Sequence, residues 1–344
     1  MSSLKSIELF AGAGGLAIGL EDSGFEHIGL VEIDKYASAT LKKNRPQWNI
    51  LNEDIEKICH RDLEEEFQIK KGELDLLSGG APCQSFSYAG KKLGLEDARG
   101  NLFLYYGFFL KTLKPKCFLF ENVRGLLSHN KGETLKTILN FFKDNGYAIQ
   151  YSVLNAWDYG VAQKRERLFM VGIRHDLADK IKFSFPKKHG YKPVLRDILE
   201  NVPKSDGARY SKEKEKIFAL VPQGGYWRDI DPEIAKKYMK TCWYMEGGRT
   251  GILRRLSYDE PSLTILTTPQ MKQTERCHPT ENRPFTIRES ARIQSFPDDW
   301  EFVGSLANQY KQIGNAVPCK LAKSIGLAIK DALIQSYNKG DGCV

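Results

Sequence analysis

Residues 5–15 have the sequence Lys-Ser-Ile-Glu-Leu-Phe-Ala-Gly-Ala-Gly-Gly, an apolar segment that runs directly into a glycine loop. The apolar segment is typical of a buried β-strand, and a helical pattern follows the loop at residues 16–23. Glycines permit a tight turn and a close approach of the backbone to a ligand, and a helix N-terminus presents unpaired N–H groups. The order of strand, glycine loop and helix therefore predicts a nucleotide-cofactor site.

A second apolar segment, residues 27–32, ends in Glu32, about 20 residues after the first glycine of the loop. A carboxylate at such a strand end can accept hydrogen bonds from two ribose hydroxyls, and Asp34 is the alternative. The pattern Gly12-x-Gly14-x-x-Ala17 also fits the looser dinucleotide fingerprint. The loop alone therefore leaves both a nicotinamide dinucleotide and S-adenosylmethionine open.

Strand-like and helix-like segments alternate from residue 5 to residue 173. Further strands are expected at residues 49–51, 74–78, 117–120, 147–154 and 168–173, and helices at residues 35–44, 102–113 and 132–145. This alternation predicts an α/β fold with a doubly wound, mostly parallel sheet.

The periodicity is lost between residues 183 and 305, where prolines, glycine pairs and clusters of basic and aromatic residues interrupt it. This change predicts a second, smaller and less regular domain. Its cations and aromatic rings suit contact with nucleic acid, but they suit an irregular surface domain as well. An amphipathic helix is expected after it, at residues 320–334.

Two residues at expected strand ends are candidates for catalysis. Cys83, within Pro82-Cys83-Gln84, follows the strand 74–78 and is placed to act as a nucleophile, the alternative being a small buried thiol. Glu121 ends the strand 117–120, and a carboxylate at the tip of a central strand points into the ligand crevice of such a sheet.

Two further pairs of residues are candidates for binding. Asp54 could hold an adenine amine while Ile55 covers the ring, or Asp54 could simply cap the helix that follows. Arg165 and Arg167 would share one face of a strand-like segment, where they could bind a phosphate or a pyrimidine carbonyl. The alternative for the arginines is a solvated, charged hairpin.

Composition narrows the class of protein. Lys and Arg total 51 against 43 acidic residues, and the resulting charge of +8 fits a polyanion partner. The 7 cysteines are scattered and form no CxxC pair, which favours a reducing, cytoplasmic setting and no metal site. The chain has no apolar run as long as a membrane span, roughly 18 residues, and no signal-peptide layout at its start.

In this order, the motifs resemble those of the cytosine-5 DNA methyltransferases, and the match covers nearly the whole chain. The motifs are Phe10-Ala11-Gly12-Ala13-Gly14-Gly15, Glu32, Asp54, Pro82-Cys83-Gln84, Glu121-Asn122-Val123, Gln163-x-Arg165-x-Arg167, Arg288-Glu289 with Gln294-Ser295-Phe296-Pro297, and Gly314-Asn315-Ala316-Val317-Pro318. Each motif is weak alone, whereas the ordered set is highly specific. Lys164 is a mild departure, because many members have arginine there.

The resemblance implies a role for each matching residue. Cys83 is implied as the nucleophile and Glu121 as the acid that binds the pyrimidine edge. Arg165 is implied as the partner of the base carbonyl, and Arg167 as a support for the site. The residues implied around the cofactor, S-adenosylmethionine, are Phe10, Gly12, Gly14, Gly15, Glu32, Asp54, Ile55, Pro82, Leu102 and Asn315.

The resemblance also implies a domain plan and an activity. Residues 1–180 with 306–337 would form the catalytic domain, and residues 181–305 the target-recognition domain. The implied reaction moves a methyl group to carbon 5 of a cytosine flipped out of double-stranded DNA, through a covalent cysteine adduct. The implied setting is a bacterial restriction–modification system, with a monomeric enzyme in the cytoplasm and a cognate restriction endonuclease as functional partner.

Three other functions are compatible with part of the sequence. An RNA (tRNA) cytosine-5 methyltransferase of the same fold is compatible with the catalytic motifs, but the large irregular segment favours duplex DNA. A non-enzymatic DNA-binding relative would not need the catalytic groups, all of which are present. A nicotinamide oxidoreductase would leave Cys83, Glu121 and the paired arginines unexplained.

Overall fold

The computed structural model describes residues 3–81 and 102–340, which divide into two units. The first unit comprises the described residues up to 155 together with 166–188 and 319–340, and the second comprises 156–165 and 189–318. This division differs from the expected domain boundaries, because residues 156–165 and 306–318 lie in the second unit and residues 181–188 in the first.

The first unit is built on a seven-stranded sheet with the order β3-β2-β1-β4-β5-β8-β6. Its strands are β1 (Leu4–Leu9), β2 (Phe25–Val31), β3 (Ile50–Leu51), β4 (Leu76–Gly79), β5 (Cys117–Val123), β6 (Tyr147–Asn155) and β8 (Glu166–Arg174). The first five strands pair in parallel, whereas β8 runs antiparallel to both β5 and β6. The expected α/β fold with a mostly parallel, doubly wound sheet is confirmed.

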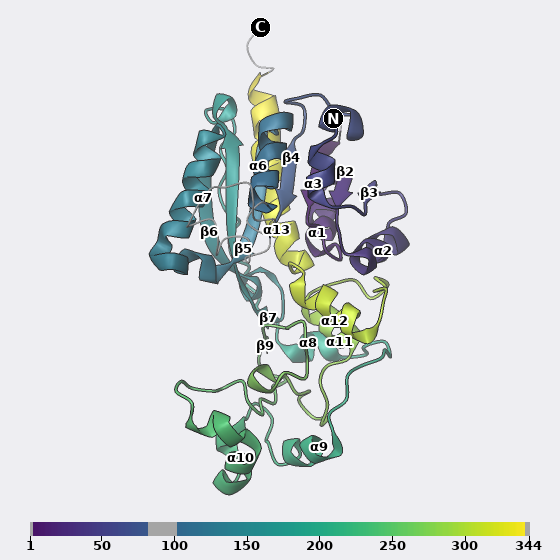
Figure 1. Cartoon of the computed structure of the whole chain (residues 1–344), viewed down its shortest axis with the longest axis vertical. Coiled ribbons are helices and arrows are strands. Elements are labelled where there is room, and N and C mark those ends of the chain that lie inside the picture. The colour runs from purple at the N-terminus through teal and green to yellow at the C-terminus, as the bar shows by residue number, and fades with distance from the viewer. Residues whose placement is uncertain (1–2, 82–101, 341–344) are drawn as a thin grey trace. The chain divides into compact units, whose positions relative to one another are not determined.

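Helices cover both faces of this sheet (Figure 1). They are α1 (Gly15–Ser23), α2 (Lys35–Asn44), α3 (Ile55–Cys59), α4 (Leu63–Glu66), α6 (Leu102–Leu113), α7 (Glu133–Asp144) and α13 (Cys319–Gly340). Ile7 and Leu9 of β1 point into an apolar core shared with α3, α4, α6 and α7. Successive side chains of a strand alternate between faces, so Ser6 and Glu8 lie on the other face, where Ser6 bonds to His27 and His27 to Ala17 of α1.

Close packing of α1 against α13 explains one glycine of α1. A Cβ added at Gly19 would lie 2.4 Å from the Cβ of Ala322 and 2.6 Å from the carbonyl oxygen of Cys319. The C-terminal helix therefore belongs to the sheet unit even though the second unit separates it in sequence.

The second unit is less regular, as expected from its composition. It holds the helices α8 (Leu195–Leu199), α9 (Lys212–Phe218), α10 (Pro232–Met239), α11 (Ile287–Ile293) and α12 (Leu306–Asn315), and a strand pair of β7 (Gln163–Lys164) with β9 (Ser262–Leu263). Part of its apolar core contains Phe218 and Trp227. The buried Arg255 donates hydrogen bonds to the carbonyl oxygens of Val221, Phe218 and His278, so this arginine supports the fold.

A bilayer-spanning helix is absent from residues 3–81 and 102–340, since none of their helices combines the necessary length with the necessary apolarity.

Candidate functional site

The glycine loop has an unusual backbone. Phe10, directly after β1, has a φ of 58°, which is costly for a bulky residue and is typical of ligand sites held in place by their surroundings. Gly12 and Gly14 have φ values of 56° and 90°, which glycine adopts without strain. A Cβ added at Gly12 would find no atom within 4 Å, so open space adjoins the loop among the described residues.

Glu32, 8% exposed, joins this loop to the end of β2. Its Oε2 accepts a hydrogen bond from the backbone N–H of Gly12 at 2.7 Å, and its Oε1 accepts one from the N–H of Asp34 at 2.7 Å. Each carboxylate oxygen can accept more than one hydrogen bond, so these contacts are compatible with ribose binding. Glu32 therefore also fixes the conformation of the glycine loop, beside which a cofactor would lie.

Two neighbours of Glu32 were missed by the sequence analysis. The side-chain amide of Asn52 donates hydrogen bonds to the carbonyl oxygens of Glu32 and Ile33 and so fixes the end of β2. The side chain of Ile33 is 64% exposed, which leaves an apolar surface beside the loop. Its position directly after the strand-end acid was the available signal.

Asp34 after β2 and Asp54 after β3 each cap the helix that follows. Asp54 accepts a hydrogen bond from the N–H of Glu56 at 3.0 Å, so the capping alternative is confirmed for it, and Asp34 likewise caps α2. Ile55 is buried in the core and Leu102 packs partly against that core at the start of α6. Pro82 and Cys83 lie outside the described residues, so their predicted roles stay predictions.

Glu121 and Arg167 form an ion pair at the carboxyl end of β5. Their Oε1 and Nε lie 3.0 Å apart, and the two side chains are 16% and 15% exposed. The antiparallel register explains the contact, because Arg167 of β8 is opposite Val123 of β5, two residues beyond Glu121. The guanidinium of Arg167 therefore orients the Glu121 carboxylate at this strand end.

The chain that leaves β4 passes close to Glu121. A Cβ added at Gly80 would lie 2.7 Å from the carbonyl oxygen of Glu121 and 2.8 Å from its Oε2. Asn122, which the sequence analysis did not assign to the site, donates a hydrogen bond to the carbonyl oxygen of Ala81 at 3.1 Å. These contacts bring the segment that leads to Cys83 beside the carboxyl end of β5.

Four of the described cysteines are inert at neutral pH. Burial raises the pKa of Cys59 and of Cys277 to about 12, and it also raises the pKa of Cys117 and of Cys319. These thiols stay protonated and cannot serve as thiolate nucleophiles. Among the residues of the described ranges, no cluster of three or more His, Cys, Asp or Glu side chains could hold a metal ion.

The structure places Arg165 in the second unit and Arg167 in the first. Arg165 is 1% exposed and donates hydrogen bonds to the carbonyl oxygens of Ile265, Gly314 and Ala316, at 3.3, 2.9 and 2.9 Å. Asn315 lies between the last two of these, exposed at the end of α12. Arg165 thus supports the loop that carries Asn315.

The other signature residues of the second unit are also buried and hydrogen-bonded. Gln163 donates to Gln294 at 2.9 Å, and Gln294 donates to the carbonyl oxygen of Ile313 at 2.7 Å. Arg288 donates to the carbonyl oxygens of Pro297 and Trp300. The roles that the structure gives these side chains are therefore to hold segments of this unit together.

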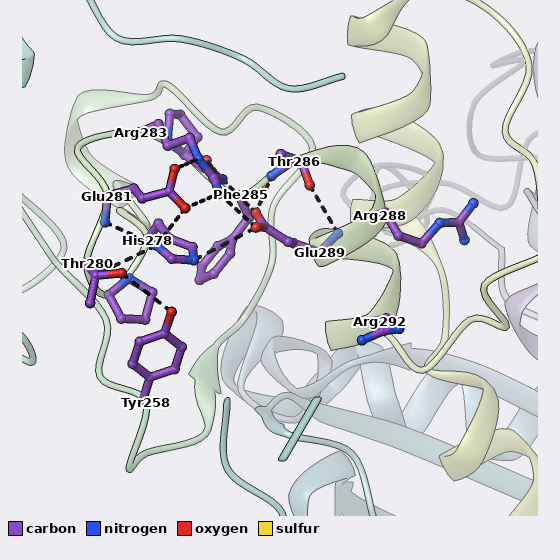
Figure 2. A network of polar contacts seen from close by, with 12 residues as sticks. Tyr258, His278, Thr280, Glu281, Arg283, Phe285, Thr286, Arg288, Glu289 and Arg292 are labelled. Atoms are coloured by element: carbon purple, nitrogen blue, oxygen red, sulfur yellow. Dashed lines mark hydrogen bonds and ion pairs between the residues drawn. The ribbon is translucent and has the colours of Figure 1, made fainter. Parts of the chain in front are cut away.

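Figure 2 shows how Glu289 holds the preceding loop on α11. Its carboxylate accepts two hydrogen bonds from the Arg283 guanidinium, at 2.7 and 2.8 Å, and one from the N–H of Thr286 at 2.7 Å. The Thr286 hydroxyl in turn accepts a hydrogen bond from the N–H of Glu289, which completes a capping box. His278 lies beside this network, with its Nε2 3.8 Å from Glu289.

Several known proteins resemble this chain in sequence. The model of a family described as C-5 cytosine-specific DNA methylase matches residues 4–331. The type II methyltransferase M.Sau96I of Staphylococcus aureus is 54% identical over 330 residues, which cover 95% of this chain and 76% of the relative. M.Eco47II, a type II methyltransferase of Escherichia coli, is 49% identical over 341 residues, covering 97% and 80% of the two chains.

Solved structures give the same fold. A prophage-encoded protein of Escherichia coli superposes with a TM-score of 0.72 at 26% identity, over 96% of this chain and 100% of the other. DNMT2 of Spodoptera frugiperda shares the fold with a TM-score of 0.67 at 19% identity, over 97% of this chain and 100% of the other.

Proposed function

This chain belongs to the C-5 cytosine-specific DNA methylase family, and we propose that it uses S-adenosylmethionine as methyl donor and Cys83 as nucleophile. The family match over residues 4–331 makes it a DNA (cytosine-5)-methyltransferase. The observation that carries the proposal for the site is the Glu121–Arg167 pair, because Glu121 lies beside the backbone at Gly80, three residues before Cys83 in the sequence.

The glycine loop is the proposed binding site for S-adenosylmethionine, which supplies an electrophilic sulfonium methyl group when bound. The open space beside Gly12 and the exposed side chain of Ile33 fit such a ligand. Glu32 binds the ribose hydroxyls, and Phe10, Gly14 and Gly15 shape the cradle. Further contacts are proposed for the following residues: Asp54, Ile55, Pro82, Leu102 and Asn315.

The chemistry requires a nucleophile because carbon 5 of cytosine is unreactive in the aromatic ring. Addition of the Cys83 thiolate to carbon 6 makes carbon 5 an enamine carbon, which can take the methyl group. Departure of the carbon 5 proton and of the thiolate then restores the ring. At an ordinary cysteine pKa of about 8.5, only a few per cent of the thiol is ionised at neutral pH, so a nearby cation would accelerate the reaction.

Glu121 is proposed to bind the pyrimidine edge and to share a proton with the ring nitrogen. This proton offsets the negative charge that develops on the ring when the thiolate adds. Arg167 is proposed to hold the carboxylate of Glu121 in position, through the ion pair at 3.0 Å. Arg165 is proposed to contact the base carbonyl in addition to its bonds within the second unit.

The second unit is proposed as the target-recognition region. Cytosine carbon 6 is inaccessible in a stacked duplex, so the base has to leave the helix at a cost of a few kcal/mol, which contacts to the duplex must offset. The type II methyltransferases at 49–54% identity support a role in DNA modification. They do not favour the RNA alternative. A cognate restriction endonuclease as functional partner, a cytoplasmic location and a monomeric state are proposed with that role.

Bisulfite sequencing tests the proposal directly. Genomic DNA from a methylation-deficient bacterial host that expresses the chain is expected to contain protected cytosines within one short motif. Cys83→Ala is expected to abolish protection while S-adenosylmethionine binding, measured by calorimetry, persists. No protection by a folded wild-type protein that binds the cofactor would contradict the DNA substrate, and undiminished protection by Cys83→Ala would contradict the nucleophile.

A further inference from the structure

The short strand β3 ends beside the acid of the proposed cofactor site. The last backbone contact between β3 and the end of β2 is the hydrogen bond from the N–H of Glu32 to the carbonyl oxygen of Leu51, at 3.0 Å. Asn52 follows directly, and its side-chain amide donates to the carbonyl oxygens of Glu32 and Ile33, at 2.9 and 3.2 Å. Asn52 therefore continues the attachment between the two strands past the end of β3.

The two acceptors fix the orientation of the Asn52 amide. Carbonyl oxygens only accept hydrogen bonds, so the group that faces both of them is the NH₂ group, which has two N–H donors. Asn52 is exposed, and its side chain forms no other hydrogen bond with the residues that the structure describes. The structure thus gives this side chain one task, which is to hold the main chain of Glu32 and Ile33.

The main chain held by Asn52 carries two groups that adjoin the glycine loop. The Glu32 carboxylate accepts hydrogen bonds from the N–H groups of Gly12 and Asp34, each at 2.7 Å, and it can meet both donors only if the main chain at Glu32 stays in place. The next residue, Ile33, is 64% exposed. One amide therefore fixes both the acid and the exposed apolar residue of the proposed cofactor site.

Asn49 makes a similar contact at the other end of β3. Its side-chain amide donates to the carbonyl oxygen of Ile28 at 3.0 Å, and Asn49 is exposed, as Asn52 is. Ile28 lies within β2, before the strand reaches Glu32. The two asparagines join the same strands with the same chemistry, but only Asn52 does so at the carboxyl ends, where parallel sheets bind their ligands.

We propose that Asn52 is a positioning residue for cofactor binding. By holding the main chain of Glu32 and Ile33, its amide keeps the Glu32 carboxylate in the geometry that binds the ribose hydroxyls of S-adenosylmethionine. The inference rests on the cofactor of the proposed function. It adds to that function a residue that none of the motifs behind the family resemblance contains.

Calorimetric titration with S-adenosylmethionine tests the proposal in the wild type, Asn52→Ala and Asn49→Ala. Loss of the Asn52 hydrogen bonds is expected to raise Kd by about 3- to 10-fold, as one ordinary hydrogen bond would. Asn49→Ala is the matched control and is expected to stay within about twofold of the wild type. Equal Kd values for the two alanine variants would overturn the proposal.

A double variant decides whether Asn52 acts through Glu32. In a Glu32→Gln background, Asn52→Ala is expected to raise Kd by no more than about twofold further, because the carboxylate that Asn52 positions has already been replaced. Losses that multiply in full would mean that Asn52 acts independently of Glu32, and they would overturn the positioning role. A folded wild type that binds no S-adenosylmethionine would overturn the proposed cofactor as well, so the two failures are distinguishable.

An isosteric variant and thermal melting separate positioning from general stability. Asn52→Asp keeps the size of the side chain but sets an oxygen against two carbonyl oxygens, so it is expected to bind S-adenosylmethionine at least as weakly as Asn52→Ala. Wild-type affinity in Asn52→Asp would overturn the proposal. The two alanine variants are expected to have similar melting temperatures, because each loses only exposed contacts between the same two strands. A lower melting temperature for Asn52→Ala alone, with wild-type affinity, would assign it a purely structural role and overturn the proposal.

Discussion

Arg167 Nε lies 3.0 Å from Glu121 Oε1, so two residues from neighbouring antiparallel strands form one unit of the site. The pair orients the carboxylate at the carboxyl end of β5, where the chain from β4 passes. A misplacement of about 1 Å at a reacting group can reduce the rate by about 100-fold, so the pair is expected to matter for catalysis more than for stability.

Arg167→Ala is therefore expected to lower kcat by about 100-fold while leaving S-adenosylmethionine affinity within a factor of about three. Arg167→Lys keeps a positive charge but loses the fixed fork, and an intermediate kcat is expected. Single-turnover methyl transfer is the measurement. Arg61→Ala, which breaks only exposed ion pairs with Glu53 and Glu66, is the control and is expected to have wild-type kcat. A wild-type kcat for Arg167→Ala would contradict the assigned role.

Glu32→Gln is expected to weaken S-adenosylmethionine binding by about 10- to 100-fold, which corresponds to the roughly 1.5–3 kcal/mol of a hydrogen bond to a charged group. The amide would set an NH₂ group against the N–H of either Gly12 or Asp34, both of which now donate to the carboxylate. Calorimetric titration measures the change. Asp34→Asn, which keeps a side-chain oxygen that can cap α2, is expected to bind nearly as the wild type, and equal affinities for all three proteins would refute this account of the loop.

Gly80→Ala is expected to reduce methyl transfer strongly with little change in cofactor affinity. The added methyl group would lie 2.7 Å from the Glu121 carbonyl oxygen and 2.8 Å from Oε2, so either the carboxylate or the chain leading to Cys83 must move. Gly190→Ala, where a Cβ meets no described atom within 4 Å, is the matched control. Both variants are assayed for kcat and for S-adenosylmethionine affinity, and an active Gly80→Ala enzyme would show that the close approach is unimportant.

Arg165→Ala is expected to destabilise the protein more than Arg167→Ala. It leaves the carbonyl oxygens of Ile265, Gly314 and Ala316 without this donor. Each carbonyl group that stays unsatisfied lowers the free energy of unfolding by about 1–3 kcal/mol. Thermal melting measures the difference. Equal melting temperatures for the two alanine variants would indicate that the role of Arg165 in the fold is small.

Glu8→Gln is expected to stabilise the first unit at high pH. Burial, and then the charge of Glu32, raise the pKa of Glu8 well above 4.5, so the folded protein keeps a proton that the unfolded chain loses above about pH 4.5. The wild type therefore loses up to about 1.4 kcal/mol of stability per pH unit from that point to the folded pKa, and a neutral amide removes this loss. The melting-temperature difference between variant and wild type should grow from pH 5 to pH 8. The control is Glu26→Gln, at an exposed residue, for which the melting-temperature difference is expected to be independent of pH. The same pH independence for Glu8→Gln would contradict an uncharged, buried Glu8 carboxyl.

The strands, the glycine loop and the acid after β2 were predictable from local sequence, because periodicity and turn chemistry act over a few residues. The helices at residues 35–44 and 102–113 were predicted with the bounds they have in the structure. The order of motifs along the chain was likewise sufficient to identify the family. Local sequence did not reveal that β8 runs antiparallel to β5, since strand direction depends on the path of the chain between them.

The partners of the site residues were decided by tertiary structure. Arg165 was expected beside Arg167, but it bonds to carbonyl oxygens 149 and 151 residues away, and Glu121 obtains its partner only because β8 lies next to β5. From the sequence alone, Asp54 could bind an adenine amine or cap a helix. The structure shows that it accepts a hydrogen bond from the N–H of Glu56 and therefore caps α3. Arg254 and Arg255 are adjacent and chemically identical, yet Arg255 is buried among carbonyl oxygens whereas the side chain of Arg254 is 18% exposed. Sequence specifies which groups are present, but their hydrogen-bond partners depend on distances that arise only when remote segments pack together.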